Sequence, residues 1–346
     1  MKKIKLKVYP YTYVRATVMR SLLTKREDYL RLIKMDLNSI IKFLEESVCK
    51  KEIDRLLAEY SGMDLIEIAL NENLAASFNK LRRISSPEIR LLIDAYSKRK
   101  DIENIKTILR AKYTKTSESE LKKLISSAGT FEYSFFVELF KMESTEQILK
   151  NIKVIPFDSL QKGYESFLKE NNLSGIESAL DRFYYHELID FSKLIPKQGK
   201  MFREFLEKEI EIINIRTLFK LNREKINKEE IKNYLILDGK LSHHLAGSAN
   251  MDDLIDRLGK TKYGSTLKDG IEKLKKENTL IDLEIALYNQ LLKQSTLLLH
   301  QHPLSVDVIL GYLFAKEIEI RNLKIITKGK QLGLSESFIE QQMVML

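Results

Sequence analysis

Residues 303–328 read PLSVDVILGYLFAKEIEIRNLKIITK and hold the clearest copy of a pattern that the chain repeats three times. Near the end of this stretch an acid, an asparagine, an aliphatic residue and a base stand in the segment EIRNLK, and the same order recurs in EIINIR and DIENIK. The three asparagines are 110 and 108 residues apart (214 − 104 and 322 − 214). Self-similarity at such a regular spacing indicates a repeated architecture. The signature residues are Asp101, Asn104 and Lys106, then Glu211, Asn214 and Arg216, then Glu319, Asn322 and Lys324.

Landmarks on both sides of the asparagines extend the match. A proline precedes each asparagine by 17, 18 and 19 residues (104 − 87, 214 − 196 and 322 − 303), and these prolines are Pro87, Pro196 and Pro303. A residue suited to the N-cap of a helix follows each asparagine by 13 positions, namely Ser117, Asn227 and Ser335. Glu120 and Glu230 then occupy the capping-box position in the first two copies. Each copy therefore predicts a proline-started helix that carries the asparagine, a short turn and a capped second helix, with the first long helix at about 87–113.

The wider pattern predicts an all-α fold of three helical units at 1–126, 127–236 and 237–346. Gly129 and Gly239 each lie 25 residues after an asparagine (129 − 104 and 239 − 214), which lengthens the repeat. The chain has only 13 Gly and 5 Pro, too few for the many turns of an all-β fold. Strand-like alternation is limited to Met1–Lys7, which could form an edge strand or an extended arm. Thr24 and Glu27 fit a capping box at the start of a further helix.

Bulk composition bounds the class of protein. The chain has 346 residues, 44% hydrophobic and 31% charged, which is typical of a globular protein, and its net charge of +9 suits nucleic acid, an anionic membrane surface or an acidic protein partner. A single cysteine, Cys49, excludes an internal disulfide and fits a reducing compartment. Neither a signal-peptide pattern nor an uncharged apolar stretch of membrane-spanning length is present in the sequence, so we expect a cytoplasmic protein without a transmembrane segment.

The sequence offers little material for catalysis. It has no glycine-rich phosphate loop, and its five histidines lack the spacing and the carboxylate or cysteine partners of a metal site. Most acids stand within three or four residues of a base, as on a solvated helix face. We therefore expect no catalytic residue, cofactor or metal.

The repeated asparagine has a physical rationale. Asparagine is a poor residue for the middle of a helix because its amide competes for backbone hydrogen bonds. Its presence in all three copies predicts that each amide has a partner on a neighbouring helix or loop. The signature is thus interpreted as structural, with a contact surface for a protein partner as the alternative.

Three stretches carry a resemblance to a known family. They are YTYVRATVMRSLLTKREDYLRLIKM at 11–35, DIENIKTILRAK at 101–112 and HPLSVDVILGYLFAKEIEIRNLKIITKGK at 302–330. The chain resembles the C subunits of archaeal and bacterial V-type (A-type) ATP synthases, which are related to the d subunit of the eukaryotic vacuolar ATPase. The likeness spans the chain, and the region around Asn214 matches less closely.

This resemblance implies a funnel of three pseudo-symmetric helical domains. It implies a non-catalytic rotor subunit of the central stalk, a socket on the cytoplasmic side that links the membrane proteolipid ring to the shaft of D and F subunits. A socket of this kind couples transport of H⁺ or Na⁺ to ATP synthesis or hydrolysis. The positive charge would suit an anionic membrane surface.

Two other classes stay open at the level of sequence. An unrelated α-helical scaffold that binds a protein partner would share the composition, although repeats in such scaffolds are usually much shorter. A nucleic-acid-binding helical protein would use the positive charge, yet the bases alternate with acids and form no basic stripe with stacking aromatics. We therefore expect no nucleic-acid partner.

Overall fold

The fold is described from a computed structural model that covers residues 4, 9–236, 239–277, 279–301 and 305–345. These residues form α-helices, one 3₁₀ turn and loops, with no strand among them, so the prediction of an all-α fold is confirmed. The predicted strand or arm at 1–7, apart from Ile4, and the helix-starting Pro303 lie outside the described residues. No helix in the described part of the chain is long and apolar enough to cross a bilayer.

Backbone contacts divide the chain into two compact units. The first, the terminal unit, joins Ile4–Glu143 to Ser295–Leu346, and the second, the central unit, comprises Ser144–Gln294. Two of the repeated asparagines, Asn104 and Asn322, belong to the terminal unit, and Asn214 belongs to the central unit.

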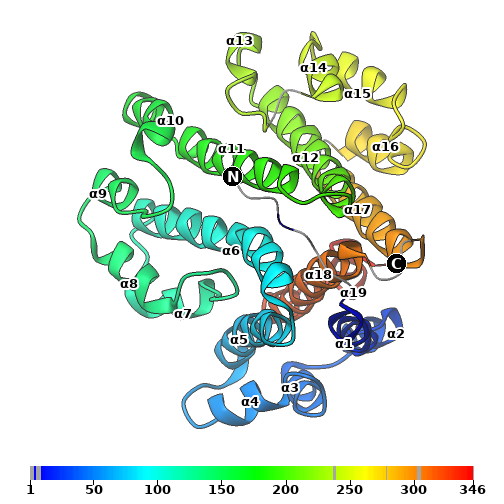
Figure 1. Ribbon diagram of the computed structural model, residues 1–346. Coiled ribbons are helices and arrows are strands. Elements are labelled where there is room, and N and C mark those ends of the chain that lie inside the picture. Colours follow the sequence, from blue (N-terminus) through cyan, green and yellow to red (C-terminus); the bar gives the residue numbers. More distant parts are fainter. Residues whose placement is uncertain (1–3, 5–8, 237–238, 278, 302–304, 346) are drawn as a thin grey trace. The chain divides into compact units, whose positions relative to one another are not determined.

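The terminal unit is built around α18 (Val306–Gln331), drawn in orange in Figure 1. Every residue from Val306 to Phe314 is buried, because this first part of the helix is apolar apart from Asp307 and the helix packs against α1, α2, α3, α5 and α6 as well as α19. The other helices of the unit are α1 (Pro10–Ser21), α2 (Arg26–Leu32), α3 (Leu37–Glu45), α4 (Lys50–Leu56), α5 (Gly62–Arg83), α6 (Pro87–Tyr113), α7 (Leu121–Leu124) after a 3₁₀ turn (Glu118–Glu120), α8 (Tyr133–Lys141) and α19 (Glu336–Gln341).

The central unit is organised around α12 (Gln198–Arg223), which packs against α11, α14 and α15. A helical hairpin of α10 and α11 forms its most extensive pair. The helices besides α12 are α9 (Thr145–Lys150), α10 (Phe157–Glu170), α11 (Ser174–Lys193), α13 (Lys228–Ile231), α14 (Lys240–Ala246), α15 (Met251–Gly259), α16 (Lys268–Glu277) and α17 (Ile281–Gln301), of which α17 continues into the terminal unit.

The three asparagine helices, α6, α12 and α18, end in the same way. The residue 11 positions after each asparagine has a positive φ (115 − 104, 225 − 214 and 333 − 322), and the next N–H donates to the carbonyl five residues earlier. This is the geometry of a helix closed by a left-handed residue. The left-handed residues are Lys115, Lys225 and Gly333, with φ of 55°, 57° and 66°. The predicted sequence of long helix, turn and short helix is therefore present in all three copies.

The predicted N-caps hold with one difference in their hydrogen bonds. Asn227 and Ser335 accept a backbone N–H of the following helix. Ser117 stands at the N-cap of the 3₁₀ turn, but its hydroxyl lies 2.9 Å from Ser119 Oγ instead of capping an N–H. Glu120 makes no capping-box contact and pairs instead with Lys123 at 2.9 Å.

The predicted capping box at Thr24 is wrong by one residue. Helix α2 begins at Arg26 with Lys25 at its N-cap, and the Lys25 N–H donates to Asp28 Oδ2. Thr24 does not serve as the cap because its N–H and hydroxyl both donate to Glu319 on α18. A long-range acceptor has replaced the local one.

Candidate functional site

The three asparagine amides make the same pair of hydrogen bonds. Each donates from Nδ2 to the carbonyl of the residue 22 positions later and accepts the N–H of that same residue at Oδ1. The two N···O distances are 2.9 and 3.3 Å for Asn104 with Ser126, 2.7 and 2.9 Å for Asn214 with Ile236, and 2.8 and 3.0 Å for Asn322 with Val344. We call each of these three pairings an asparagine clamp.

The three asparagine side chains are buried, so their hydrogen bonds matter for stability. The exposed fractions of Asn104, Asn214 and Asn322 are 5%, 1% and 0%. Buried backbone N–H and C=O groups have to be paired, and the partner residues follow a short helix whose ladder has already ended. Each amide thus ties the segment after the second helix of its copy back to the long helix.

The acid three residues before each asparagine also binds hydrogen-bond donors, but not in the same manner each time. Asp101 accepts the N–H groups of Thr130 and Phe131 and the Thr130 hydroxyl, just before α8 begins. Burial nevertheless raises the pKa of Asp101. Glu319 accepts the N–H and hydroxyl of Thr24, at 2.6 and 2.8 Å, just before α2 begins. Thr24 therefore makes the same contacts with the acid of the third copy that Thr130 makes with the acid of the first copy.

The acid of the second copy differs. Glu211 accepts the Tyr263 hydroxyl at 2.6 Å and pairs with Lys262 at 2.6 Å. Burial and this carboxylate raise the pKa of Tyr263. The departure agrees with the weaker sequence likeness that this region shows.

The repeated bases make different contacts. Arg216 donates to the Tyr288 hydroxyl at 2.8 Å, and Lys324 donates to Asn71 Oδ1 at 2.6 Å. Lys106, which is half-buried, lies on α6. The nine signature residues do not form one site, but two of them from different copies, Asn104 and Lys324, line the same cavity in the terminal unit.

Two buried charge clusters lie on α18, one around Glu319 of the repeat signature and one around Glu317. Lys316 pairs with Glu319 at 2.5 Å, and the two side chains are 1% and 3% exposed. Glu317 on the same helix pairs with Arg99 at 2.5 Å and Lys100 at 2.9 Å, which tie α18 to α6. The repeat marked Glu319 in the sequence, but it did not predict the buried bases that pair with the two acids.

Gly129 and Gly239 offer a matched pair of substitutions at equivalent positions. A Cβ on Gly129 would lie 2.0 Å from Asp101 Oδ1, whereas a Cβ on Gly239 would meet nothing within 4 Å. We expect Gly129→Ala to lower the free energy of unfolding by about 1–3 kcal/mol through overpacking, and Gly239→Ala to leave it nearly unchanged. Urea unfolding of both variants checks this. Equal losses at the two positions would show that the close approach to Asp101 is not what requires a glycine.

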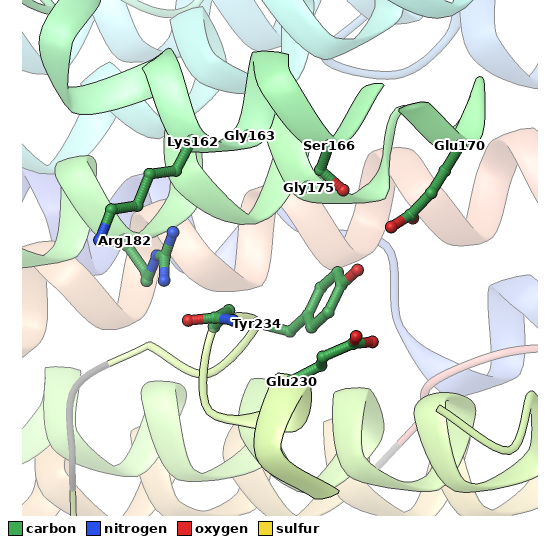
Figure 2. A pocket seen from close by; sticks show the side chains of 9 residues that line it. Lys162, Gly163, Ser166, Glu170, Gly175, Arg182, Glu230 and Tyr234 are labelled. Carbon is green, nitrogen blue, oxygen red and sulfur yellow. The ribbon is translucent and has the colours of Figure 1, made fainter. Parts of the chain in front are cut away.

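The central unit has an open polar pocket of about 350 Å³ between the α10–α11 hairpin and α13 (Figure 2). Lys162 and Arg182 lie at one end of it, and Glu170, Glu230 and Tyr234 lie toward the other. Burial lowers the pKa of Arg182 and raises that of Tyr234. Its charges are separated and none of its residues belongs to the repeat signature, so sequence reasoning did not find it. No cluster of three or more potential metal ligands occurs among the described residues.

The fold and the clamps together define a class: an all-α protein in which the same buried asparagine clamp recurs three times along the chain and holds backbone groups. Comparison with known proteins narrows this class. The family described as ATP synthase (C/AC39) subunit matches residues 12–342. The chain belongs to this family.

Similar proteins agree with that membership. The chain is 36% identical to the protein of Methanococcoides burtonii that is named as the C subunit of the A-type ATP synthase, over 97% of this chain and 94% of the relative. Proteins with the same name from Methanosarcina acetivorans and Haloferax volcanii are 34% and 32% identical, covering 98% and 97% of this chain and 93% and 97% of their own lengths. The chain is therefore a subunit of an ATP synthase complex, and the alternative of a helical scaffold unrelated to such complexes is excluded.

Proposed function

We propose that this chain is the non-catalytic connector of the central stalk in an A-type ATP synthase. In this role it is a socket on the cytoplasmic face of the membrane, with one face on the proteolipid ring and another on the shaft of D and F subunits. It would turn with the rotor and couple H⁺ or Na⁺ transport to ATP synthesis or hydrolysis. The names of the relatives give the complex and the subunit, whereas the position within the rotor is our proposal.

The single observation that carries the proposal is the threefold asparagine clamp in a chain that belongs to this family. The repeated side chains hold backbone groups and are buried, so they serve stiffness and not substrate binding. A connector that transmits torque has to be stiff. The ion pairs from α18 to α6 serve the same purpose, since Glu317 holds two cations of α6 at once.

The three-unit organisation at 1–126, 127–236 and 237–346, arranged as a funnel, is part of the same proposal. The clamps, the left-handed helix ends and the N-caps recur in register across the three segments, which supports a common ancestry for them. A funnel would give the shaft a concave seat. The anionic membrane surface beside the ring would suit the net charge of +9.

Reconstitution tests the connector directly. The full chain is mixed with the D and F shaft subunits of the same organism, with the purified proteolipid ring, and with both, and mass is measured after size exclusion. We expect a one-to-one complex with each and a ternary complex with both. A well-folded chain that binds neither would overturn the proposal, and vesicles of anionic lipid without the ring separate attraction to the membrane from attraction to the ring.

The same preparation tests the absence of catalysis. The isolated chain is expected neither to bind nor to hydrolyse ATP, because its repeated acids and amides are occupied by backbone and side-chain partners. Phosphate release is measured over an ATP titration. Saturable turnover that persists through a second purification would contradict a purely structural role.

A further inference from the structure

A cavity of about 500 Å³ lies within the terminal unit among α5, α6 and α18. The repeated base Lys324 faces this cavity, together with Arg321 and Lys328 on the same helix. These residues stand three before and four after Lys324 in the sequence, so all three occupy one face of α18. The connector function proposed above makes no use of this row of bases.

The contact of Lys324 with Asn71 is unusual for a half-buried lysine. Its Nζ donates to Asn71 Oδ1 at 2.6 Å, and among the described residues no carboxylate forms an ion pair with it. Asn71 is 3% exposed and its Nδ2 donates to the Lys123 carbonyl at 2.7 Å, which turns Oδ1 toward the lysine. The lysine thus has a neutral acceptor where most buried lysines have an acid.

The other charges of the cavity do not supply the missing partner. Lys100 forms ion pairs with Glu103 at 2.6 Å and with Glu317 at 2.9 Å, and Glu317 also pairs with Arg99. Glu67 on α5 faces Lys324 and favours its charged form, whereas Lys100 opposes it. The charged groups that line the cavity besides Lys324 are Glu67, Lys100, Glu103, Glu317, Arg321 and Lys328.

Burial dominates this balance and lowers the pKa of Lys324 to about 8. At pH 7 about a tenth of such a side chain is the neutral amine, compared with fewer than about one in a thousand for an ordinary lysine. A desolvated lysine of this kind is an activated nucleophile. The cavity opens a path to it, because Lys324 is only partly covered.

We propose that Lys324 is an acylation site, whose ε-amine accepts the acyl group of a small acyl phosphate that enters this cavity. The amine nitrogen attacks the acyl carbon, a C–N bond forms and the C–O bond to phosphate breaks. Inorganic phosphate leaves, and the nitrogen gives its extra proton to water. Arg321 and Lys328 flank the amine and would attract the phosphate group of the donor.

The product fits the same surroundings. An acylated lysine has lost its positive charge but keeps one N–H, which is enough for the hydrogen bond to Asn71 Oδ1. The modification therefore changes the charge of the cavity by one unit without leaving the asparagine oxygen unpaired. This is a switch in the electrostatics of α18 that does not depend on the connector function.

Acetyl phosphate is the probe for the test. The full chain is treated at pH 7.0 and at pH 10, and the acetylation rate at each lysine is followed by mass spectrometry of its peptides. Lys328 is the matched control, since it lies on the same helix and lines the same cavity but is exposed. At pH 7.0 we expect Lys324 to react about tenfold faster than Lys328, the larger neutral fraction being partly offset by the weaker nucleophile and the partial burial. At pH 10 the ratio is expected to fall toward one or below.

A variant isolates the cause. Asn71→Asp places a carboxylate against the ammonium, which favours the charged form and is expected to slow acetylation of Lys324 at pH 7.0 at least fivefold while leaving Lys328 unchanged. Circular dichroism of this variant confirms that it is folded. In the native chain, a rate at Lys324 equal to or below that of Lys328 at pH 7.0, or a ratio that does not change with pH, would overturn the proposal.

Discussion

Replacing Lys316 with methionine is expected to lower the free energy of unfolding by about 3–5 kcal/mol, the cost of removing one partner from a buried ion pair. The ammonium of Lys316 and the carboxylate of Glu319 lie 2.5 Å apart and are almost fully buried. Burial alone would lower the pKa of Lys316, but the attraction of Glu319, together with that of Cys49 and Tyr312, outweighs burial and raises that pKa. Without the lysine, a charged carboxylate would remain inside the core of the terminal unit.

The second oxygen of Glu319 explains why the loss cannot be relieved by a simple shift. It accepts both the N–H and the hydroxyl of Thr24, and these contacts hold the start of α2 against α18. If the carboxylate moved toward solvent, the Thr24 N–H would lose its acceptor. If it took up a proton and stayed, it would accept those bonds less strongly.

Two comparisons make this prediction specific, and urea unfolding measures all the variants. The double variant Lys316→Met with Glu319→Gln is expected to recover about half of the loss, because glutamine is uncharged and its oxygen still accepts from Thr24. Lys150→Met is the surface control: Lys150 and Glu146 lie 2.6 Å apart, but both are about half exposed, so about 0–1 kcal/mol is expected. A Lys316→Met loss no larger than that of the surface pair would show that the buried pair is not needed for stability.

The sequence predicted the long helices well because their signals are local. The helix predicted at 87–113 is observed at Pro87–Tyr113, where a proline begins it and a polar turn follows it. The left-handed residues at the ends were not predicted. Two of the three are lysines, and only the third is glycine, the residue that is usually found at such a left-handed position.

The partners of the repeated side chains could not be predicted, for a physical reason. Ser126, Ile236 and Val344 have nothing in common as side chains, because each offers its clamp only a backbone N–H and C=O. A contact made through the main chain does not require a particular residue type in the partner, so the sequence cannot reveal it. The contact of Thr24 was missed for a related reason. Its local sequence fits a capping box, and nothing in that sequence indicates the long-range hydrogen bond to Glu319.

The repeated bases show the converse: residues that match in the sequence make different contacts in the structure. Lys106, Arg216 and Lys324 look equivalent in the sequence. The side chain of Asn71, which accepts the hydrogen bond of Lys324, belongs to α5 and lies outside the repeated segment. Pattern alone assigns the three bases one role. The structure gives at least two of them different partners.

Substitution of the clamp asparagines by leucine is the second large effect that we expect. Leucine has a similar size but can neither donate nor accept, so a buried N–H and a buried C=O would both lose their partner. An unsatisfied buried group costs about 1–3 kcal/mol, and we expect Asn214→Leu and Asn322→Leu each to lower the free energy of unfolding by about 2–5 kcal/mol. Asn151→Leu is the control, because Asn151 is exposed just after α9 and, among the described residues, its amide donates to the local carbonyl of Gln147.

The location of the effect is more telling than its size. Asn214 and Ile236 lie in the central unit, whereas Asn322 and Val344 lie in the terminal unit, so each clamp stabilises its own part of the chain. Hydrogen exchange followed by mass spectrometry should show faster exchange around Ile236 in Asn214→Leu and around Val344 in Asn322→Leu, with little change at the other clamp. If Asn214→Leu instead left exchange and the melting temperature unchanged but abolished binding of the shaft subunits, that asparagine would be part of an interface and the structural interpretation of the clamps would be wrong.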